Sequence, residues 1–128
     1  MSKKSDAAAT ELREYGLTYP GAHIKSPWPD HKDLAVKDKT FAYLSVPGKP
    51  FSISCKLKQT SAKALELPFT TPTGYGLGKW SWVTATIVKG DIPTELFKEW
   101  LDESYRDQAP KKLDAMFEER RMWDTEPA

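Results

Sequence analysis

The sequence predicts a single α+β domain in which an antiparallel sheet packs against helices. A chain of 128 residues suits one hydrophobic core, which we expect over residues 6–121 of the single domain 1–128, with frayed ends. Short segments rich in β-branched and aromatic residues alternate with turn-forming residues in the middle of the chain, which is typical of antiparallel strands. Amphipathic helical patterns lie towards both ends. Five Trp, five Tyr and five Phe supply apolar surface that argues against disorder.

The first element is expected to be a helix over residues 6–17. Ser5 can cap its N-terminus, and apolar residues recur near one face at Ala8, Leu12 and Tyr15. The sequence Tyr-Pro-Gly at residues 19–21 then ends the helix. The segment 26–31 contains two prolines, which remove backbone donors and restrict the preceding residues. It is therefore predicted to be a loop, with Trp28 folded back onto the body of the domain.

Three strands are expected next, over residues 34–36, 41–46 and 51–57. Asp38 and Lys39 are expected to form a tight turn between the first two, and the segment 47–50 separates the last two. Apolar and polar residues alternate strictly in the last strand, so one face of this meander should be buried through Phe51, Ile53, Cys55 and Leu57. On this pattern Cys55 is a small core residue rather than a nucleophile.

A short helix, a loop and a further strand are predicted after the meander. Thr60 and Ser61 open a helix over residues 62–67, which Pro68 ends. The segment 69–79 is rich in Thr, Pro and Gly and is expected to be an irregular loop. Residues 80–88 are β-branched and aromatic, which predicts a strand.

The strongest helix is predicted to begin with Pro93 at its first position. Its apolar stripe comprises Leu96, Phe97, Trp100, Leu101 and Tyr105. Pro110 interrupts the helix, and a second amphipathic segment is expected to follow, with its apolar residues at Leu113, Met116, Phe117 and Trp123.

Several function classes are excluded or disfavoured by composition. No stretch approaches the roughly 18 consecutive apolar residues of a membrane helix, and the first 15 residues have no apolar core resembling a signal peptide, so we expect a cytoplasmic protein without a membrane partner. One cysteine excludes an internal disulfide, and with only two histidines it cannot build the usual zinc site. We therefore expect no metal and no cofactor.

Two patterns in the sequence resemble catalytic or phosphate-binding sites. Residues 74–79 carry three alternating glycines before Lys79, but a strand follows where a phosphate-binding loop would open a helix. A turn with glycines at positive φ explains this spacing more simply. His23 and His31 are better explained as solvated loop histidines than as acid–base or metal partners of Asp30 and Asp33. The sequence therefore predicts no enzyme.

The net charge of +1 conceals a strong separation of charge along the chain. Residues 25–89 carry ten lysines against four acidic residues, whereas residues 90–128 carry six basic and eleven acidic residues. A cationic segment indicates an anionic partner, although lysines also keep sheets soluble and their edges unpaired. The acidic run on the last long helix is most simply its solvated face, or a surface for a basic partner such as a second copy, and comprises Glu95, Glu99, Asp102, Glu103 and Asp107.

The chain resembles the MmcQ/YjbR-like family of small bacterial proteins over residues 15–113. The residues that carry the resemblance are Tyr19-Pro20-Gly21-Ala22, the segment 36–44, Ser54-Cys55-Lys56, residues 74–79 with Trp82-Val83, and Ser104-Tyr105. The resemblance implies a fold similar to secretion chaperones, in the order α-β-β-β-α-β-β-α, and a "double wing" DNA-binding role. Gly76 and Gly78 stand where the commoner family pattern has His and Asn, so two polar side chains suited to base contacts are missing.

We therefore predict a non-enzymatic module that binds nucleic acid, mainly through phosphates and with low sequence specificity. Lysines would supply the charge, and aromatic residues a stacking surface, through Lys37, Lys39, Lys56, Lys58, Tyr75, Lys79, Trp80 and Trp82. The alternative is a protein-interaction or chaperone-like module that docks a partner or a second copy through the apolar helix stripe and the Pro-Trp-Pro loop.

Overall fold

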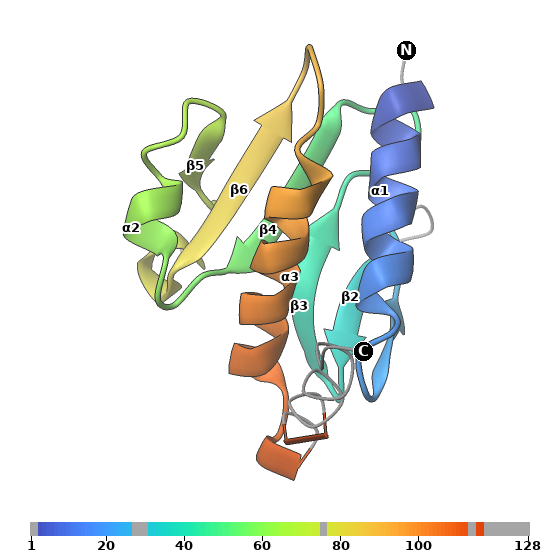
Figure 1. The fold of residues 1–128 in the computed structure, drawn as a ribbon, viewed down its shortest axis with the longest axis vertical. Coiled ribbons are helices and arrows are strands. Elements are labelled where there is room, and N and C mark those ends of the chain that lie inside the picture. The colour runs from blue at the N-terminus through green and yellow to red at the C-terminus, as the bar shows by residue number, and fades with distance from the viewer. Residues whose placement is uncertain (1–2, 27–30, 75–76, 113–114, 117–128) are drawn as a thin grey trace, which may run out of the picture.

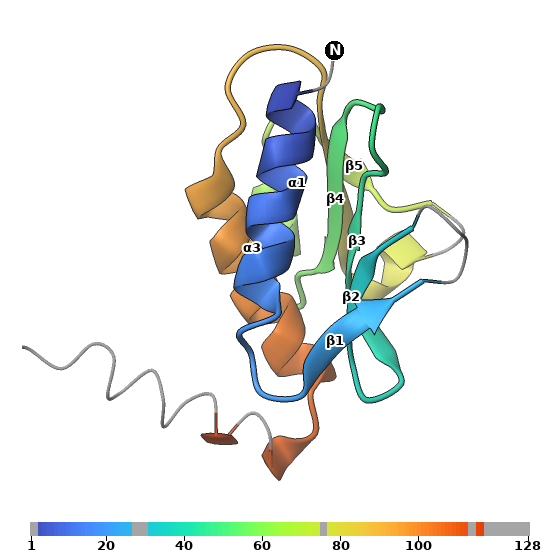
Figure 2. The ribbon, with the colours of Figure 1, turned by 90° about the vertical axis from the view of Figure 1, so that its right-hand side faces the viewer.

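A computed structural model describes residues 3–26, 31–74, 77–112 and 115–116 of the chain. It confirms the predicted α+β class, with a six-stranded antiparallel sheet whose one face is covered by two helices, α1 (Lys3–Gly16) and α3 (Thr94–Gln108) (Figure 1). In the view turned by 90°, both helices lie on the same side of the sheet (Figure 2). Within the described parts, no α-helix covers the opposite face.

The strand order across the sheet is β1-β2-β3-β4-β6-β5. The central strands are β2 (Asp33–Val36), β3 (Lys39–Leu44), β4 (Phe51–Lys56) and β6 (Trp82–Ile87), and the edges are β1 (Ala22–Lys25) and β5 (Thr70–Pro72). A short helix α2 (Ser61–Ala64) and a 3-10 helix η1 (Leu77–Trp80) lie in the connections between β4 and β6. The element order matches the one implied by the family resemblance, with β1 added.

Several element boundaries differ from the prediction. The local sequence pattern predicted neither edge strand, although the order implied by the family resemblance includes β5. The strands β1 and β5 have only four and three residues, and β5 contains a proline, which an edge strand tolerates. Residues 77–80 form η1 rather than loop and strand, so β6 begins at Trp82. Ser5 lies inside α1 rather than at its cap, and Pro93 is the N-cap of α3 rather than its first helical residue. The placement of Trp28 and most of the segment after Pro110 lie outside the described residues.

The hydrophobic core lies between the sheet and the two helices. The predicted alternation in β4 is confirmed, since Phe51, Ile53, Cys55 and Leu57 are all fully buried. Phe97 of α3 stacks on Phe51 with ring centroids 5.4 Å apart. The apolar stripe of α3 therefore packs within this chain's own core. Burial also raises the pKa of the Cys55 thiol, so this thiol stays protonated and acts as a packing residue.

A β-bulge in β3 determines which side chains face away from the helices. Leu34 pairs with Ala42 whereas Ala35 pairs with Thr40, so Phe41 is the extra residue between the two pairs. Phe41 and Ala42 are both fully buried, and the Phe41 ring contacts Tyr19 and Tyr105 on the helix side. Side chains of β3 alternate between the two faces of the sheet, and the bulge shifts this alternation by one residue. Tyr43 therefore faces the open side of the sheet.

Hydrogen bonds from α3 fix the helix to the rest of the fold. The Ser104 hydroxyl donates to the Phe41 carbonyl at 2.6 Å and accepts from the Lys56 amide at 2.9 Å, so it joins α3 to β3 and β4 beside the bulge. The hydroxyls of Tyr15 and Tyr19 both donate to the Asp102 carboxylate. Burial, and then the nearby carboxylate, raises the pKa of both tyrosines. This cluster ties the C-terminal end of α1 to α3.

Candidate nucleic-acid interface

Five of the predicted site residues lie along one end of the sheet. Lys37 occupies the β2–β3 turn at a φ of 55°, and Lys39 is the first residue of β3. Lys58 follows the end of β4, and Lys79 and Trp80 belong to η1, directly before β6. These connections share one end because β3 begins, β4 ends and β6 begins there in the antiparallel sheet (Figure 1). We call Lys37, Lys39, Lys58, Lys79 and Trp80 the basic end; all five side chains are exposed.

Trp80 is the prominent aromatic group of the basic end. Its side chain is 61% exposed, and the Lys79 ammonium lies 5.9 Å from the centre of its ring. This places a cation and an aromatic face next to each other on the surface, a pairing suited to a phosphate and a neighbouring sugar or base.

Two predicted site residues are not available to a partner in this structure. The Lys56 ammonium forms an ion pair with Asp107 of α3 at 3.0 Å. Trp82 is only 5% exposed, and its ring packs against Tyr43 with centroids 5.3 Å apart. Its role is to support Tyr43 rather than to stack on a ligand. Tyr75 lies outside the described residues.

The acidic run of α3 is only partly the solvated face that was predicted. Glu95 and Glu99 are exposed. Glu103 instead accepts hydrogen bonds from the amides of Gln59 and Thr60, and from the Thr60 hydroxyl. Asp107 binds Lys56, and Asp102 accepts from the two tyrosines. These three carboxylates stabilise the fold, so the prediction of a solvated face is wrong for them.

Close packing explains one glycine of the 74–79 segment, Gly78, whereas Gly74 faces open space. Neither Gly74 nor Gly78 has a left-handed backbone conformation, so the predicted explanation is wrong for these two. A Cβ atom on Gly78 would lie 2.8 Å from the Pro72 Cβ atom. Gly78 therefore lets η1 lie against β5.

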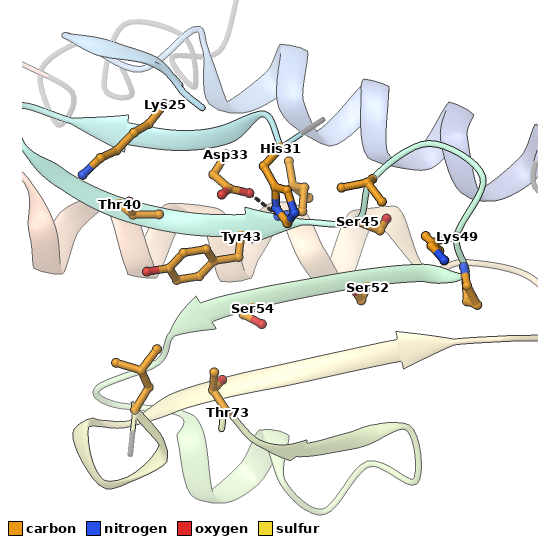
Figure 3. A pocket seen from close by; sticks show the side chains of 14 residues that line it. Lys25, His31, Asp33, Thr40, Tyr43, Ser45, Lys49, Ser52, Ser54 and Thr73 are labelled. Carbon is orange, nitrogen blue, oxygen red and sulfur yellow. Dashed lines mark hydrogen bonds between the residues drawn. The ribbon is translucent and has the colours of Figure 1, made fainter. Parts of the chain in front are cut away.

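The open face of the sheet carries a groove that no sequence pattern predicted. Its volume is about 690 Å³, and it runs along β3 and β4 (Figure 3). Hydroxyl groups line its floor: Ser54 and Thr73 each bond to Thr84, at 2.6 and 2.8 Å. Tyr43 contributes the aromatic surface. The polar residues Ser52 and Ser54, alternating with the buried residues of β4, were the signal for a polar face, but the bulge concealed that Tyr43 belongs to it.

Asp33 lies at the wall of this groove and is almost completely buried. One carboxylate oxygen accepts the Leu44 amide at 3.0 Å. Burial raises the pKa of Asp33, while the Leu44 hydrogen bond and the charges of His31 and Arg13 lower it by less. Among the described residues, no three His, Cys, Asp or Glu side chains lie close enough to hold a metal ion.

The raised pKa of Asp33 predicts a specific pH dependence of stability. The Asp33 carboxylate binds its proton more tightly in the folded protein than in the unfolded chain, where its pKa is near 3.8. Ionisation of Asp33 therefore lowers the free energy of unfolding. We expect the free energy of unfolding of the wild type, relative to Asp33→Asn, to rise as pH falls through the raised pKa and to level off below about pH 4. Urea unfolding at a series of pH values measures this difference. Exposed Asp38→Asn is the control, and an identical pH profile for both variants would contradict the prediction.

The fold is that of a small α+β protein with one sheet face covered by helices and one face open. The chain belongs to the YjbR family, whose model, described as YjbR, matches residues 17–107. This confirms the family resemblance and the fold it implied. No curated protein matches the chain.

Solved structures share this fold. The Deinococcus radiodurans protein DR2400, described as carrying the domain DUF419, is 24% identical, with a TM-score of 0.65 over 85% of this chain and 86% of that one. A Pseudomonas syringae protein is 17% identical, with a TM-score of 0.59 over 77% of this chain and 97% of that one. In the part of the chain that the structure describes, no helix is long and apolar enough to cross a membrane.

Proposed function

We propose that this protein is a non-enzymatic, cytoplasmic module that binds nucleic acid through phosphate contacts at the basic end. The observation that carries the proposal is the exposure of four lysines and Trp80 along one end of the sheet, although they come from three separate connections. When ammonium groups neutralise phosphates, the cations condensed on the nucleic acid are released. This release contributes affinity that does not depend on base sequence.

The chemistry of the basic end favours low sequence specificity. Lysine is a point charge and lacks the planar fork with which arginine reads guanine or grips phosphate. The four charged residues of the basic end are all lysines. Phosphate contacts of this kind position a nucleic acid but do not identify its bases.

The alternative function is a protein-interaction or chaperone-like module that docks a partner or a second copy through the apolar stripe of α3 and the Pro-Trp-Pro loop. The loop, residues 27–29, lies outside the described residues, and most of the stripe is covered in this structure. Phe97, Trp100, Leu101 and Tyr105 are at most 4% exposed because they fill the core. A partner could reach them only if the domain opened, which would expose this core to water.

Chemical-shift mapping tests the location of the proposed interface. Adding oligo(dT) of about 12 nucleotides to the ¹⁵N-labelled protein is expected to shift the amides of Lys37, Lys39, Lys58 and Lys79, and the indole N–H of Trp80. The amides of the exposed residues Glu95 and Lys89 serve as internal controls, because they lie on α3 and after the far end of β6. Shifts centred on α1 or α3, or no shifts at low salt, would contradict the proposal.

A further inference from the structure

The groove on the open face is continuous with the basic end. Thr40, which lines the groove, directly follows Lys39, and Leu77, also in its lining, is the first residue of η1. From there the groove extends along β3 and β4 to Lys49, in the connection before β4 (Figure 3). A strand bound by its phosphates at the basic end is therefore in position to enter the groove.

We propose that this groove holds an unpaired base of a single-stranded nucleic acid against the ring of Tyr43. The inference rests on the proposed function and adds the form of nucleic acid and the residue that contacts its base. Bases within a duplex are stacked and paired, so only an unpaired base can reach a ring on the floor of a groove. The groove volume of about 690 Å³ lies within the range of about 300–1,000 Å³ found for small-ligand sites.

Tyr43 has the exposure and the support that a stacking platform needs. Its side chain is 38% exposed, and the buried Trp82 packs against its ring at an interplanar angle of 52°. The bulge at Phe41 turns Tyr43 to the open face, where Ser54 is its cross-strand neighbour. A ring held by a second aromatic residue loses little conformational freedom when a base stacks on it.

The polar groups of the groove suit any base equally. Its described lining includes the hydroxyls of Thr40, Ser45, Ser52, Ser54 and Thr73. A hydroxyl can both donate and accept a hydrogen bond, so it can meet either kind of atom on a base edge. The described lining contains no Arg, Asn or Gln, the residues that read bases through paired hydrogen bonds. We therefore expect the base to be bound with little preference for its identity.

The charge of the groove is compatible with a polyanion. Lys25 and Lys49 both line it and lie on opposite sides of the view in Figure 3. The acidic residue in its described lining is Asp33, which is 2% exposed and uses its carboxylate to accept the Leu44 amide. The cationic groups are thus accessible to phosphates while the carboxylate is withdrawn from the surface.

A comparison of normal and abasic strands tests this inference. Labelled oligo(dT) and an abasic strand of the same length, about 12 nucleotides, present the same phosphates but differ in having bases. At about 50 mM NaCl, the wild type is expected to bind oligo(dT) about 10-fold more tightly than the abasic strand. Tyr43→Ala should remove this difference without changing the affinity for the abasic strand, whereas Tyr43→Phe, which keeps the ring, should retain it.

The outcomes separate the inference from the proposed function. Equal binding of both strands by the wild type would overturn the base site and leave phosphate binding intact. No binding of either strand at low salt would overturn both. The comparison of strands on the wild type needs no variant, and thermal unfolding of Tyr43→Ala and Tyr43→Phe establishes that both are folded under the assay conditions. A base preference unchanged in Tyr43→Ala would overturn the assignment to Tyr43.

Discussion

Replacing Lys39 and Lys79 together by Gln is expected to weaken binding of single-stranded DNA about 50-fold at about 50 mM NaCl. The two side chains belong to β3 and η1 and are both exposed. Each phosphate contact to a single strand contributes about 0.7 to the slope of log K against log salt, so losing two contacts should also reduce that slope by about 1.4. Fluorescence anisotropy with labelled oligo(dT) measures both quantities.

The matched control removes the same charge from the other end of the sheet. Lys32 precedes β2 and Lys89 follows β6, and both side chains are exposed. The variant Lys32→Gln with Lys89→Gln is expected to bind within about threefold of the wild type, because its lysines contact the strand only through long-range, screened electrostatics. Equal losses in the two double variants would show that net charge, and not the basic end, governs binding.

Asp102→Ala is expected to lower the free energy of unfolding by about 3 kcal/mol. The substitution leaves the hydroxyls of Tyr15 and Tyr19 without their shared acceptor, and Tyr19 is 3% exposed. An unsatisfied buried donor costs about 1–3 kcal/mol, and the Tyr19 hydroxyl is the buried one of the two, whereas Tyr15 is only partly buried. Denaturant unfolding followed by circular dichroism measures the loss.

Two comparisons isolate the hydrogen bonds from other effects. Asp102→Asn keeps an acceptor oxygen and should lose about 1 kcal/mol. Glu99→Ala, an exposed position on the same helix, should change stability by less than about 0.5 kcal/mol. If Asp102→Ala were no less stable than Glu99→Ala, the tyrosine cluster would not hold α1 to α3 as described.

The main architecture could be predicted from the sequence because it depends on local patterns. Strict alternation in β4 identified the buried face, and helical spacing identified Phe97, Trp100, Leu101 and Tyr105 as a stripe. Edge strands β1 and β5 gave no comparable pattern, since each is too short to show one. Their strand conformation depends on pairing with β2 and β6, which is a tertiary effect.

The candidate site was predictable in part for the same reason. The local run of Lys79 and Trp80 was sufficient to mark an aromatic and basic surface, and the structure shows both side chains exposed. Trp82 is also an aromatic residue close to Lys79 in the sequence. As the first residue of β6, however, it packs against Tyr43. Asp107 lies 51 positions after Lys56, so its ion pair could not be seen in sequence spacing. Likewise, the groove depends on the bulge at Phe41, which places Tyr43 on the open face of the sheet instead of the helix-covered face.

The salt dependence of binding tests most directly the claim that nucleic acid is held by phosphates at the basic end. Labelled oligo(dT) would be titrated with the wild-type protein from about 25 to about 200 mM NaCl. Four lysine contacts to a single strand predict saturable binding at low salt and a slope of log K against log salt of about −3. Absence of binding at the lowest salt, or an affinity that does not change with salt, would contradict the account.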